Sequence, residues 1–452
     1  MPKLVTANLS NILHYTTSDN HMLNIKADAF DADIISHTYN NGEGQIIFNK
    51  QITSIEKHAF SDCSNLISVI IPNSVTLIGV VAFSGCTGLM SVIIPDSVTS
   101  IRGGAFSCCS SLTSITIPDR VTSIGPGAFS GCSSLKSVTI PNSVTWIGEN
   151  AFAWCESLTA FYGKFASSDN RCLIINGVLN SFAPVGLTDY TIPDNVTSIG
   201  KCAFYDCSSL TSVIIPNSVT SIRSQAFRNC TSLTSITIPD SITSIEYAAF
   251  YGCGSLTSVI IPDSVTLIEN DVFCGCTGEL IINRKTLVEK DYTFLPNSKS
   301  SKDNSCLCDN RFTKLTIGNN ITKIGDYTFD RWSNLASVII GNSVTSIGSY
   351  AFSGCDSLVD ITIPDSVTSI AEGAFAGCES LSIITIPNSV TSIADGAFYK
   401  CSSLKTIICK ASTPPALGKD AFYKISADAT IIIPEGCEEA YMNSDWKHLF
   451  EE

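Results

Sequence analysis

Residues 111–132 read SLTSITIPDRVTSIGPGAFSGC, and this string decides the fold because the chain repeats it. Close copies occupy 134–155, 209–230, 232–253 and 357–378. A dipeptide ending in Phe recurs every 23 residues within three blocks of the chain. The phenylalanines that mark this period are Phe60, Phe83, Phe106, Phe129, Phe152, Phe204, Phe227, Phe250, Phe273, Phe329, Phe352, Phe375 and Phe398. A period between about 20 and 29 residues is typical of a leucine-rich solenoid.

Apolar residues keep the same offsets in every copy. The run L-x-x-I-x-I alternates, so we expect Ile115 and Ile117 on one face of a strand and Ser114 and Thr116 on the other. Pro118 then ends this strand, because proline has no N–H to donate. The following VTSI predicts a second short strand, and GPGAFSGC predicts a tight helical turn whose Ala, Phe and Cys point inward.

One copy has too few apolar side chains to fold alone, so neighbouring copies must stack and bury a shared core. The sequence therefore predicts an α/β solenoid, a right-handed leucine-rich repeat superhelix of about 15 coils of 23 residues. We expect a parallel β-sheet on its concave face, with short helical turns and second short strands elsewhere.

Two insertions interrupt the array but leave its register unchanged. The first, at about 159–186, contains RCLIINGVLNSFA, in which two apolar runs flank an Asn-Gly pair and predict a β-hairpin. The second, at about 279–311, is polar and rich in Ser and Lys, and predicts a surface loop.

The two ends of the chain differ from the repeats, as caps of a solenoid must. We expect an N-terminal cap over 1–48, the repeat array over 49–409 and a C-terminal cap over 410–452. The C-terminal cap should end in an amphipathic helix. Its residues Tyr441, Trp446 and Leu449 are predicted to close the open apolar end of the array.

Composition excludes several classes of function. Only 15% of the residues are charged and the net charge is −14, so nucleic acid and anionic membranes are poor partners. No apolar run approaches the 18 residues that a transmembrane helix needs. The first 20 residues lack the pattern of a secretory signal. A cytoplasmic chain and a secreted chain that has lost its signal both remain open.

With these residues in view, the chain resembles the BspA-like family of leucine-rich repeat proteins, the treponemal type. The pattern L-x-x-I/V-x-I-P-x-x-V-T-x-I-x-x-x-A-F-x-x-C covers about 49–409. The segments beginning FYGKFASSDNRC and CKASTPPALG also resemble parts of such proteins from gut anaerobes. The resemblance implies a bacterial protein, secreted or on the cell surface, that adheres to host matrix, host cells or other bacteria and has no enzymatic activity. Gly318 and Gly341 replace the usual Pro, and Trp332 replaces the repeated Cys, so we expect the first coils of the third block to be less regular.

Most of the 20 cysteines follow the repeat. A residue held by register in an apolar column is typically a small buried hydrophobe, so we expect free, buried thiols there. This column comprises Cys63, Cys86, Cys109, Cys132, Cys155, Cys207, Cys230, Cys253, Cys276, Cys355, Cys378 and Cys401. Off this register, Cys306 and Cys308 have no second pair or histidine near them in sequence, so we predict no metal site.

Catalytic residues are scarce. The five histidines are His14, His21, His37, His58 and His448, and none lies between 59 and 447. A Ser-His or Cys-His hydrolase would have to take its base from a cap. The pair Glu438-Glu439 is interpreted as solvated charge at the start of a helix. No Gly-rich phosphate loop follows a strand. The sequence therefore predicts no enzyme and no cofactor.

The outward side chains of the L-x-x-I-x-I strands form the candidate binding surface. One outward column is mainly serine, and the next consists largely of β-branched residues, which gives a nearly uncharged strip. Exposed apolar strips of this length often mark interaction surfaces, although β-branched residues also simply suit strands. The strip comprises Ile70, Ile93, Thr116, Thr139, Tyr162, Ile214, Thr237, Ile260, Ile339, Thr362, Thr385 and Ile408, with Tyr162 as a possible aromatic anchor.

A regular threonine column is a second surface feature. Such an array could order water, but the neighbouring column mixes Ser with Leu77, Trp146, Leu267 and Lys323, which spoils a flat surface. We therefore interpret these threonines as strand residues. They are Thr76, Thr99, Thr122, Thr145, Thr197, Thr220, Thr243, Thr266, Thr322, Thr345, Thr368 and Thr391.

Two functions follow from these features. The first is adhesion by the concave strip, with a protein or glycan of the host matrix or a cell surface as partner. The second is a structural spacer that displays its insertions or flanking regions without binding by the repeat face itself. The sequence identifies neither the ligand nor the oligomeric state.

Overall fold

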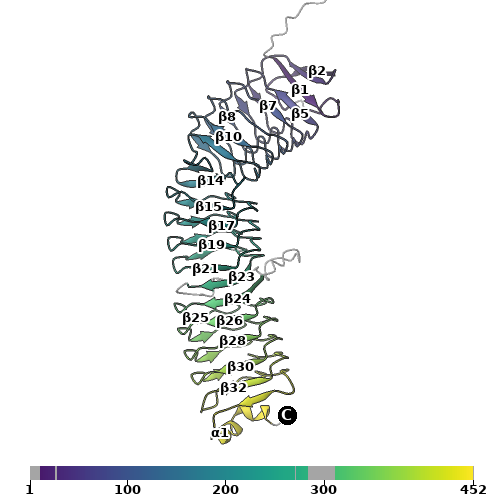
Figure 1. The fold of residues 1–452 in the computed structure, drawn as a ribbon. Coiled ribbons are helices and arrows are strands. Elements are labelled where there is room, and N and C mark those ends of the chain that lie inside the picture. Colours follow the sequence, from purple (N-terminus) through teal and green to yellow (C-terminus); the bar gives the residue numbers. More distant parts are fainter. Residues whose placement is uncertain (1–10, 26–27, 270, 284–310, 451–452) are drawn as a thin grey trace, which may run out of the picture. The chain divides into compact units, whose positions relative to one another are not determined.

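The structure is a computed structural model, and it describes residues 11–25, 28–269, 271–283 and 311–450. These residues form a β-solenoid of about 15 turns with a repeat of about 23 residues and almost no helix. The chain divides into two compact units, one of 1–188 with 193–210 and the other of 189–192 with 211–452. In each unit the strands of successive coils lie side by side (Figure 1).

Unit 1 begins with an antiparallel sheet in the order β2-β3-β1, which continues through β5 into the parallel strand β7. A second parallel sheet is formed by the V-T-x-I segments. The first group of strands is β1 (Ile12–Thr17), β2 (Ile34–Asn40), β3 (Glu43–Phe48), β5 (Leu66–Ile70), β7 (Ser91–Ile93), β10 (Ser137–Ile140) and β12 (Ala160–Gly163). The second sheet is β4 (Ser54–Ile55), β6 (Leu77–Ile78), β8 (Ser100–Ile101), β9 (Ser123–Ile124) and β11 (Trp146–Ile147).

The first insertion is a β-hairpin, as predicted. Strands β13 (Cys172–Ile175) and β14 (Val178–Phe182) pair antiparallel around Asn176 and Gly177. Both turn residues have positive φ angles, 50° and 79°, which is the geometry that favours Asn-Gly in a two-residue hairpin. Strand β14 also pairs in parallel with β16 (Ser198–Ile199), so the insertion supplies part of the array's own sheet.

Unit 2 continues both kinds of strand. Its first group is β15 (Asp189–Thr191), β17 (Ser212–Ile214), β19 (Ser235–Thr237), β21 (Ser258–Ile261), β23 (Thr277–Ile282), β24 (Arg311–Ile317), β26 (Ser337–Ile340), β28 (Asp360–Thr362), β30 (Ile383–Ile386), β32 (Thr406–Cys409) and β34 (Thr430–Ile432). The second group is β18 (Ser221–Ile222), β20 (Ser244–Ile245), β22 (Leu267–Ile268), β25 (Lys323–Ile324), β27 (Ser346–Ile347), β29 (Ser369–Ile370), β31 (Ser392–Ile393) and β33 (Ala416–Leu417).

The second insertion begins later than predicted. Residues 279–282 belong to β23, whose Leu280 pairs with Val259 of β21 only 21 residues earlier. Strand β24 then pairs with both β23 and β26, and its four-residue register with β26 is regular. The expectation of irregular coils at the start of the third block is therefore wrong. The predicted surface loop itself falls largely on 284–310, outside the described residues.

The helical turns predicted for the A-F-x-x-C segments are also wrong, because the described coils of the array contain turns there and no helix. Residues two positions before and after each phenylalanine have positive φ, such as Val81 at 49° and Gly85 at 74°. These conformations turn alternate N–H groups toward the next coil. The Phe83 amide donates to the Ala105 carbonyl (2.7 Å), and the Gly85 amide donates to Ser107 (2.8 Å). A third side of the coil thus has its own ladder of backbone hydrogen bonds.

The strand expected at 112–117 is not regular in this coil, although the predicted alternation holds. Ile115 and Ile117 are buried, and Ser114 and Thr116 are exposed. One backbone bond links this segment to the next coil, from the Lys136 amide to the Thr113 carbonyl (3.1 Å). Burial of alternate side chains therefore does not require a continuous ladder in every coil.

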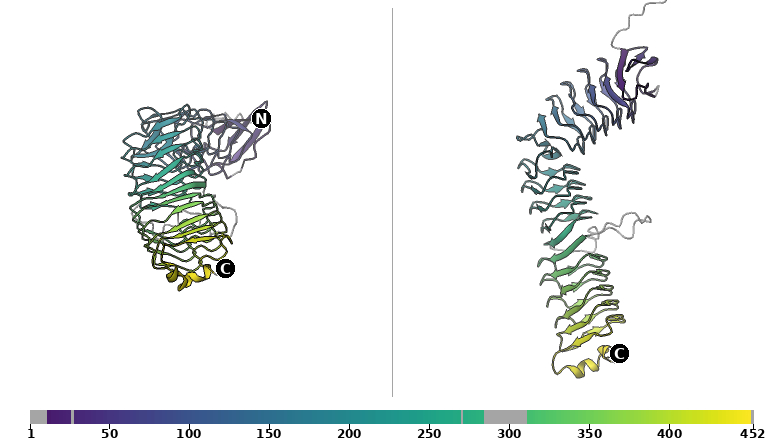
Figure 2. Two further views of the ribbon diagram at one scale, coloured as in Figure 1. Left: turned by 60° about the horizontal axis from the view of Figure 1, so that its bottom comes forward. Right: turned by 45° about the vertical axis from the view of Figure 1, so that its right-hand side comes forward.

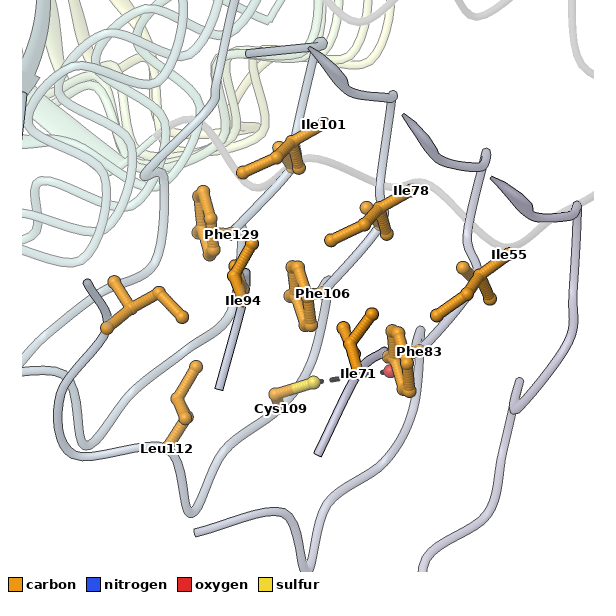
Figure 3. Packing of buried hydrophobic residues seen from close by; sticks show 14 of the residues in the cluster. Ile55, Ile71, Ile78, Phe83, Ile94, Ile101, Phe106, Cys109, Leu112 and Phe129 are labelled. Carbon is orange, nitrogen blue, oxygen red and sulfur yellow. Dashed lines mark hydrogen bonds between the residues drawn. The ribbon is translucent and has the colours of Figure 1, made fainter. Parts of the chain in front are cut away.

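Phenylalanine rings fill the centre of the coils. Successive rings stack nearly parallel, for example Phe83 on Phe106 with centroids 5.1 Å apart and an interplanar angle of 1°. Figure 3 shows Phe83, Phe106 and Phe129 in one column, with Ile55, Ile78 and Ile101 in a second column beside it. Each phenylalanine that marks the period is buried, so neighbouring coils share one core.

The C-terminal segment forms two short helices instead of one. They are α1 (Glu438–Met442) and the 3-10 helix η3 (Asp445–Leu449), which lie at the end of unit 2 (Figure 2). Tyr441 and Trp446 are fully buried, while Leu449 is only half-buried. The Trp446 ring lies 5.7 Å from Phe422, and its Nε1 donates to the Pro415 carbonyl (2.8 Å).

Candidate binding surface

The predicted strip lies on the outward face of the L-x-x-I-x-I strands. In unit 1, Ile70 pairs with Ile93 across β5 and β7, and Thr139 pairs with Tyr162 across β10 and β12. All four of these side chains, and Thr116 between them, are exposed. Register brings them into one row because parallel strands place equivalent residues side by side.

The strip of unit 2 follows the same rule over more coils. Ile214, Thr237, Ile260, Ile339 and Thr362 are exposed. Thr385 and Ile408 are only half-buried. The sequence pattern missed further members, Thr191, Ile281, Thr316 and Ile432, which pair with Ile214, Ile260, Ile339 and Ile408, respectively. The shortened coil at β23 shifts Ile281 and Thr316 out of the 23-residue register, so only the pairing could have revealed them.

The column beside the strip is mainly polar and carries few charges. In unit 2 it includes Ser212, Ser235 and Ser258, which occupy equivalent positions on β17, β19 and β21. Glu279 and Lys314 interrupt it, and their side chains form an ion pair of 3.1 Å. Since each charge there offsets the other, this part of the surface stays close to neutral.

The threonine column has a structural explanation. The Thr99 amide and hydroxyl both donate to the Thr76 carbonyl, at 2.9 and 3.3 Å, and Thr122 repeats this arrangement on Thr99. Each hydroxyl proton is thus directed at the preceding coil. Threonine at this position reinforces the stacking of coils.

The cysteine column adds a contact that the sequence did not predict. The Cys86 thiol donates to the Phe60 carbonyl (3.0 Å), and Cys109 donates to Phe83 (3.2 Å; Figure 3). The same contact recurs at Cys132, Cys155, Cys253, Cys276, Cys355, Cys378 and Cys401. As predicted, the cysteines of this column are free thiols, and all except the half-buried Cys63 are buried. Burial raises the pKa of the Cys132 thiol to about 12.

Exposed aromatic residues gather on the turn side of the coils, where the sequence analysis did not look for a site. In unit 2, Tyr327 stacks on Tyr350 with centroids 5.1 Å apart, and the Tyr350 hydroxyl donates to Glu372 (2.8 Å). Tyr399 likewise stacks on Tyr423 at 5.8 Å. Because these rings cover one another's faces, their stacking extends the order of the coils to the surface.

The comparison with family models decides the family. A model described as "BspA type Leucine rich repeat region" matches residues 32–159, 179–300 and 300–428, which is most of the chain. The chain belongs to this family. A search of curated proteins found no match to this BspA type chain.

Solved structures of bacterial repeat proteins are similar to the BspA type chain. A leucine-rich repeat protein from Bacteroides ovatus is 28% identical, with 88% of this chain and 90% of that one covered and a TM-score of 0.56. A leucine rich cell surface protein from Faecalibacterium prausnitzii is 25% identical over 98% and 97% of the two chains, with a TM-score of 0.30. A T. pallidum leucine rich repeat protein is 27% identical over 46% and 73%, with a TM-score of 0.25.

Within the described part of this BspA type chain, no group of three or more potential ligands could hold a metal ion. Cys306 and Cys308 lie outside the described residues. The His37 ring accepts or donates a hydrogen bond with the Tyr15 hydroxyl (2.6 Å), and burial lowers the pKa of His37. Glu438 and Glu439 are exposed in the first turn of α1, as expected. Among the described helices, none has the length and apolarity to cross a membrane.

Proposed function

We propose that this BspA type protein is a non-enzymatic adhesion protein whose strip binds a host matrix component or another cell surface. The observation that carries the proposal is the exposure of in-register isoleucines on one sheet face. Ile93 is 60% exposed, Ile214 is 59% exposed and Ile260 is 47% exposed. Aliphatic side chains exposed in a continuous row gain free energy when a partner covers them, at about 25 cal/mol per Å² of apolar area.

The compartment belongs to the same proposal. An adhesive surface requires the protein to face its partner outside the cell, and membership of the BspA type family supports a secreted or surface location. The partner is a protein or a glycan, without nucleic acid, because the net charge of −14 repels a phosphate backbone.

A pair of matched variants tests the strip. Ile260 and Leu267 belong to the same coil and are similarly exposed, at 47% and 49%, but they lie on different sheets. We expect Ile260→Asp, combined with Ile214→Asp, to abolish capture of purified matrix proteins or mucosal glycans by the full chain. Leu267→Asp should leave capture unchanged.

A structural spacer is the second candidate, and the same experiment separates it from adhesion. If both kinds of variant capture the ligand as well as the wild type does, the strip is not the binding surface. Deleting the first insertion would be a poor test, because Leu173 and Leu179 of its hairpin are fully buried and β14 pairs within the array.

A further inference from the structure

The partner of the strip can be narrowed by its spacing and by the charges that border it. This step rests on the proposed function and concerns four consecutive coils of unit 2. Strands β17, β19, β21 and β23 pair in that order and carry Ile214, Thr237, Ile260 and Ile281 at equivalent positions. A partner that covers all four residues must run across the strands.

The spacing of the coils favours a helix over an extended chain. Four coils span three intervals of about 4.8 Å, which is about 14 Å. Three turns of an α-helix rise about 16 Å, so one helical turn can meet each coil with an accumulated mismatch of about 2 Å. Side chains on one face of an extended chain are about 6.7 Å apart, and three such steps cover about 20 Å. That mismatch exceeds one whole coil.

The border of the strip favours a basic partner. Three residues after each strip residue, the chain carries Asp or Asn, here Asn217, Asp240, Asp263 and Asn283. Across the described segments 211–217, 234–240, 257–263 and 277–283 there is no Lys, Arg or His. Glu279 on the opposite border is neutralised by Lys314 from β24. Negative charge therefore remains on one side of the strip.

We infer that this part of the strip binds an amphipathic α-helix of a partner protein, with aliphatic side chains against the strip and Lys or Arg along the flank that faces Asp240 and Asp263. The apolar side chains supply contact area, and the cations select the orientation of the helix. The net charge of −14 would also speed the approach of such a partner.

Designed peptides of about five helical turns test the inference on the full chain. The first has a Leu face flanked by Lys, the second replaces Lys by Glu, and the third has the composition of the first in an alternating, strand-like order. We expect the Lys helix to bind the wild type best when measured by fluorescence anisotropy. The variant Asp240→Asn with Asp263→Asn should weaken that binding roughly fivefold, since each exposed pair contributes little. Native Asn217 and Asn342 occupy equivalent positions, so the substitutions should be tolerated.

The outcomes separate this inference from the proposed function. Equal binding of the Lys and Glu peptides, stronger binding of the alternating peptide, or no effect of the Asp→Asn substitutions would overturn the basic helix. If capture of matrix proteins still depends on Ile260 in that case, adhesion by the strip stands. If Ile260→Asp changes neither peptide binding nor capture, the proposed function fails with it.

Discussion

Two residues in each coil hold positive φ angles, and they explain why the turn segments are not helical. Glycine adopts this conformation without steric cost, and it fills both positions around Phe129 and Phe375. Other coils place Asn, Asp or bulkier residues there, including Trp154 and Tyr350. The sequence offers glycine as the only clear signal, so the pattern becomes visible only when the coils are aligned on their phenylalanines.

Val81 is the least suitable occupant of such a position, because a β-branched residue at a φ of 49° is strained. We expect Val81→Gly to stabilise the protein by about 1 kcal/mol, since relief of strain exceeds the entropy cost of glycine. The urea unfolding midpoint measures the effect. Ser84→Gly, three residues later at ordinary φ, is the control and should destabilise. Equal destabilisation by both changes would contradict the role assigned to Val81.

Buried thiols make stability depend on alkaline pH. Because burial raises the pKa of Cys132 from 9.0 to about 12, the folded state favours the neutral thiol. This contribution is complete below pH 9.0 and is lost as the pH rises toward about 12. Each such thiol should steepen the fall of the unfolding free energy by up to about 1.4 kcal/mol per pH unit.

The variant Cys132→Ala isolates one thiol of the column. Between about pH 9 and pH 11, its unfolding free energy should fall less steeply with pH than that of the wild type. Urea titrations at several pH values provide the comparison. Superimposable slopes for the two proteins would show that the thiol is already ionisable in the folded state.

Among the elements, the phenylalanine column was the easiest to predict, because a fixed offset in every repeat requires equivalent positions in every coil. The alternation of L-x-x-I-x-I predicted burial correctly even at 112–117, where the strand is irregular. The turn segment was misjudged because A-F-x-x-C has helix-like spacing. What decides its conformation is hydrogen bonding to the neighbouring coil, such as Phe83 N–H to Ala105, and a single repeat does not contain that partner.

Removing one ring from the phenylalanine column should damage two contacts at once. Phe106 stacks on Phe83 at 5.1 Å and on Phe129 at 5.4 Å. We expect Phe106→Ala to destabilise unit 1 by about 3–5 kcal/mol, because the surrounding coils cannot collapse into the cavity. Ile93→Ala, on the exposed strip, should change the unfolding free energy by less than about 0.5 kcal/mol. If the two substitutions cost the same, the ring column is not the core of the coil.

At the scale of the whole molecule, an array of stacked coils leaves apolar ends that must be covered. The N-terminal end is met by the antiparallel pairing of β1 with β5, in which Tyr15 lies opposite Val69 and is buried. The C-terminal end is met by Tyr441, whose hydroxyl donates to the Ala411 carbonyl (2.7 Å), and by Trp446. The aromatic residues of the last cap were predictable from the break in the repeat. The split into α1 and η3 was not, since it depends on how these rings reach the last coil.

The C-terminal cap should protect the coils nearest to it more than the distant ones, because each coil contacts only its neighbours. We expect Trp446→Ala to remove the contact with Phe422 and to reduce hydrogen-exchange protection of β32 and β34 by at least about tenfold, while β17 and β19 keep theirs. Phe450→Ala is the matched control, because Phe450 is in the same segment but exposed. Unchanged protection of β32 and β34 in Trp446→Ala would mean that the ring does not close the array. Uniform loss across unit 2 would mean instead that its coils unfold as a single cooperative block.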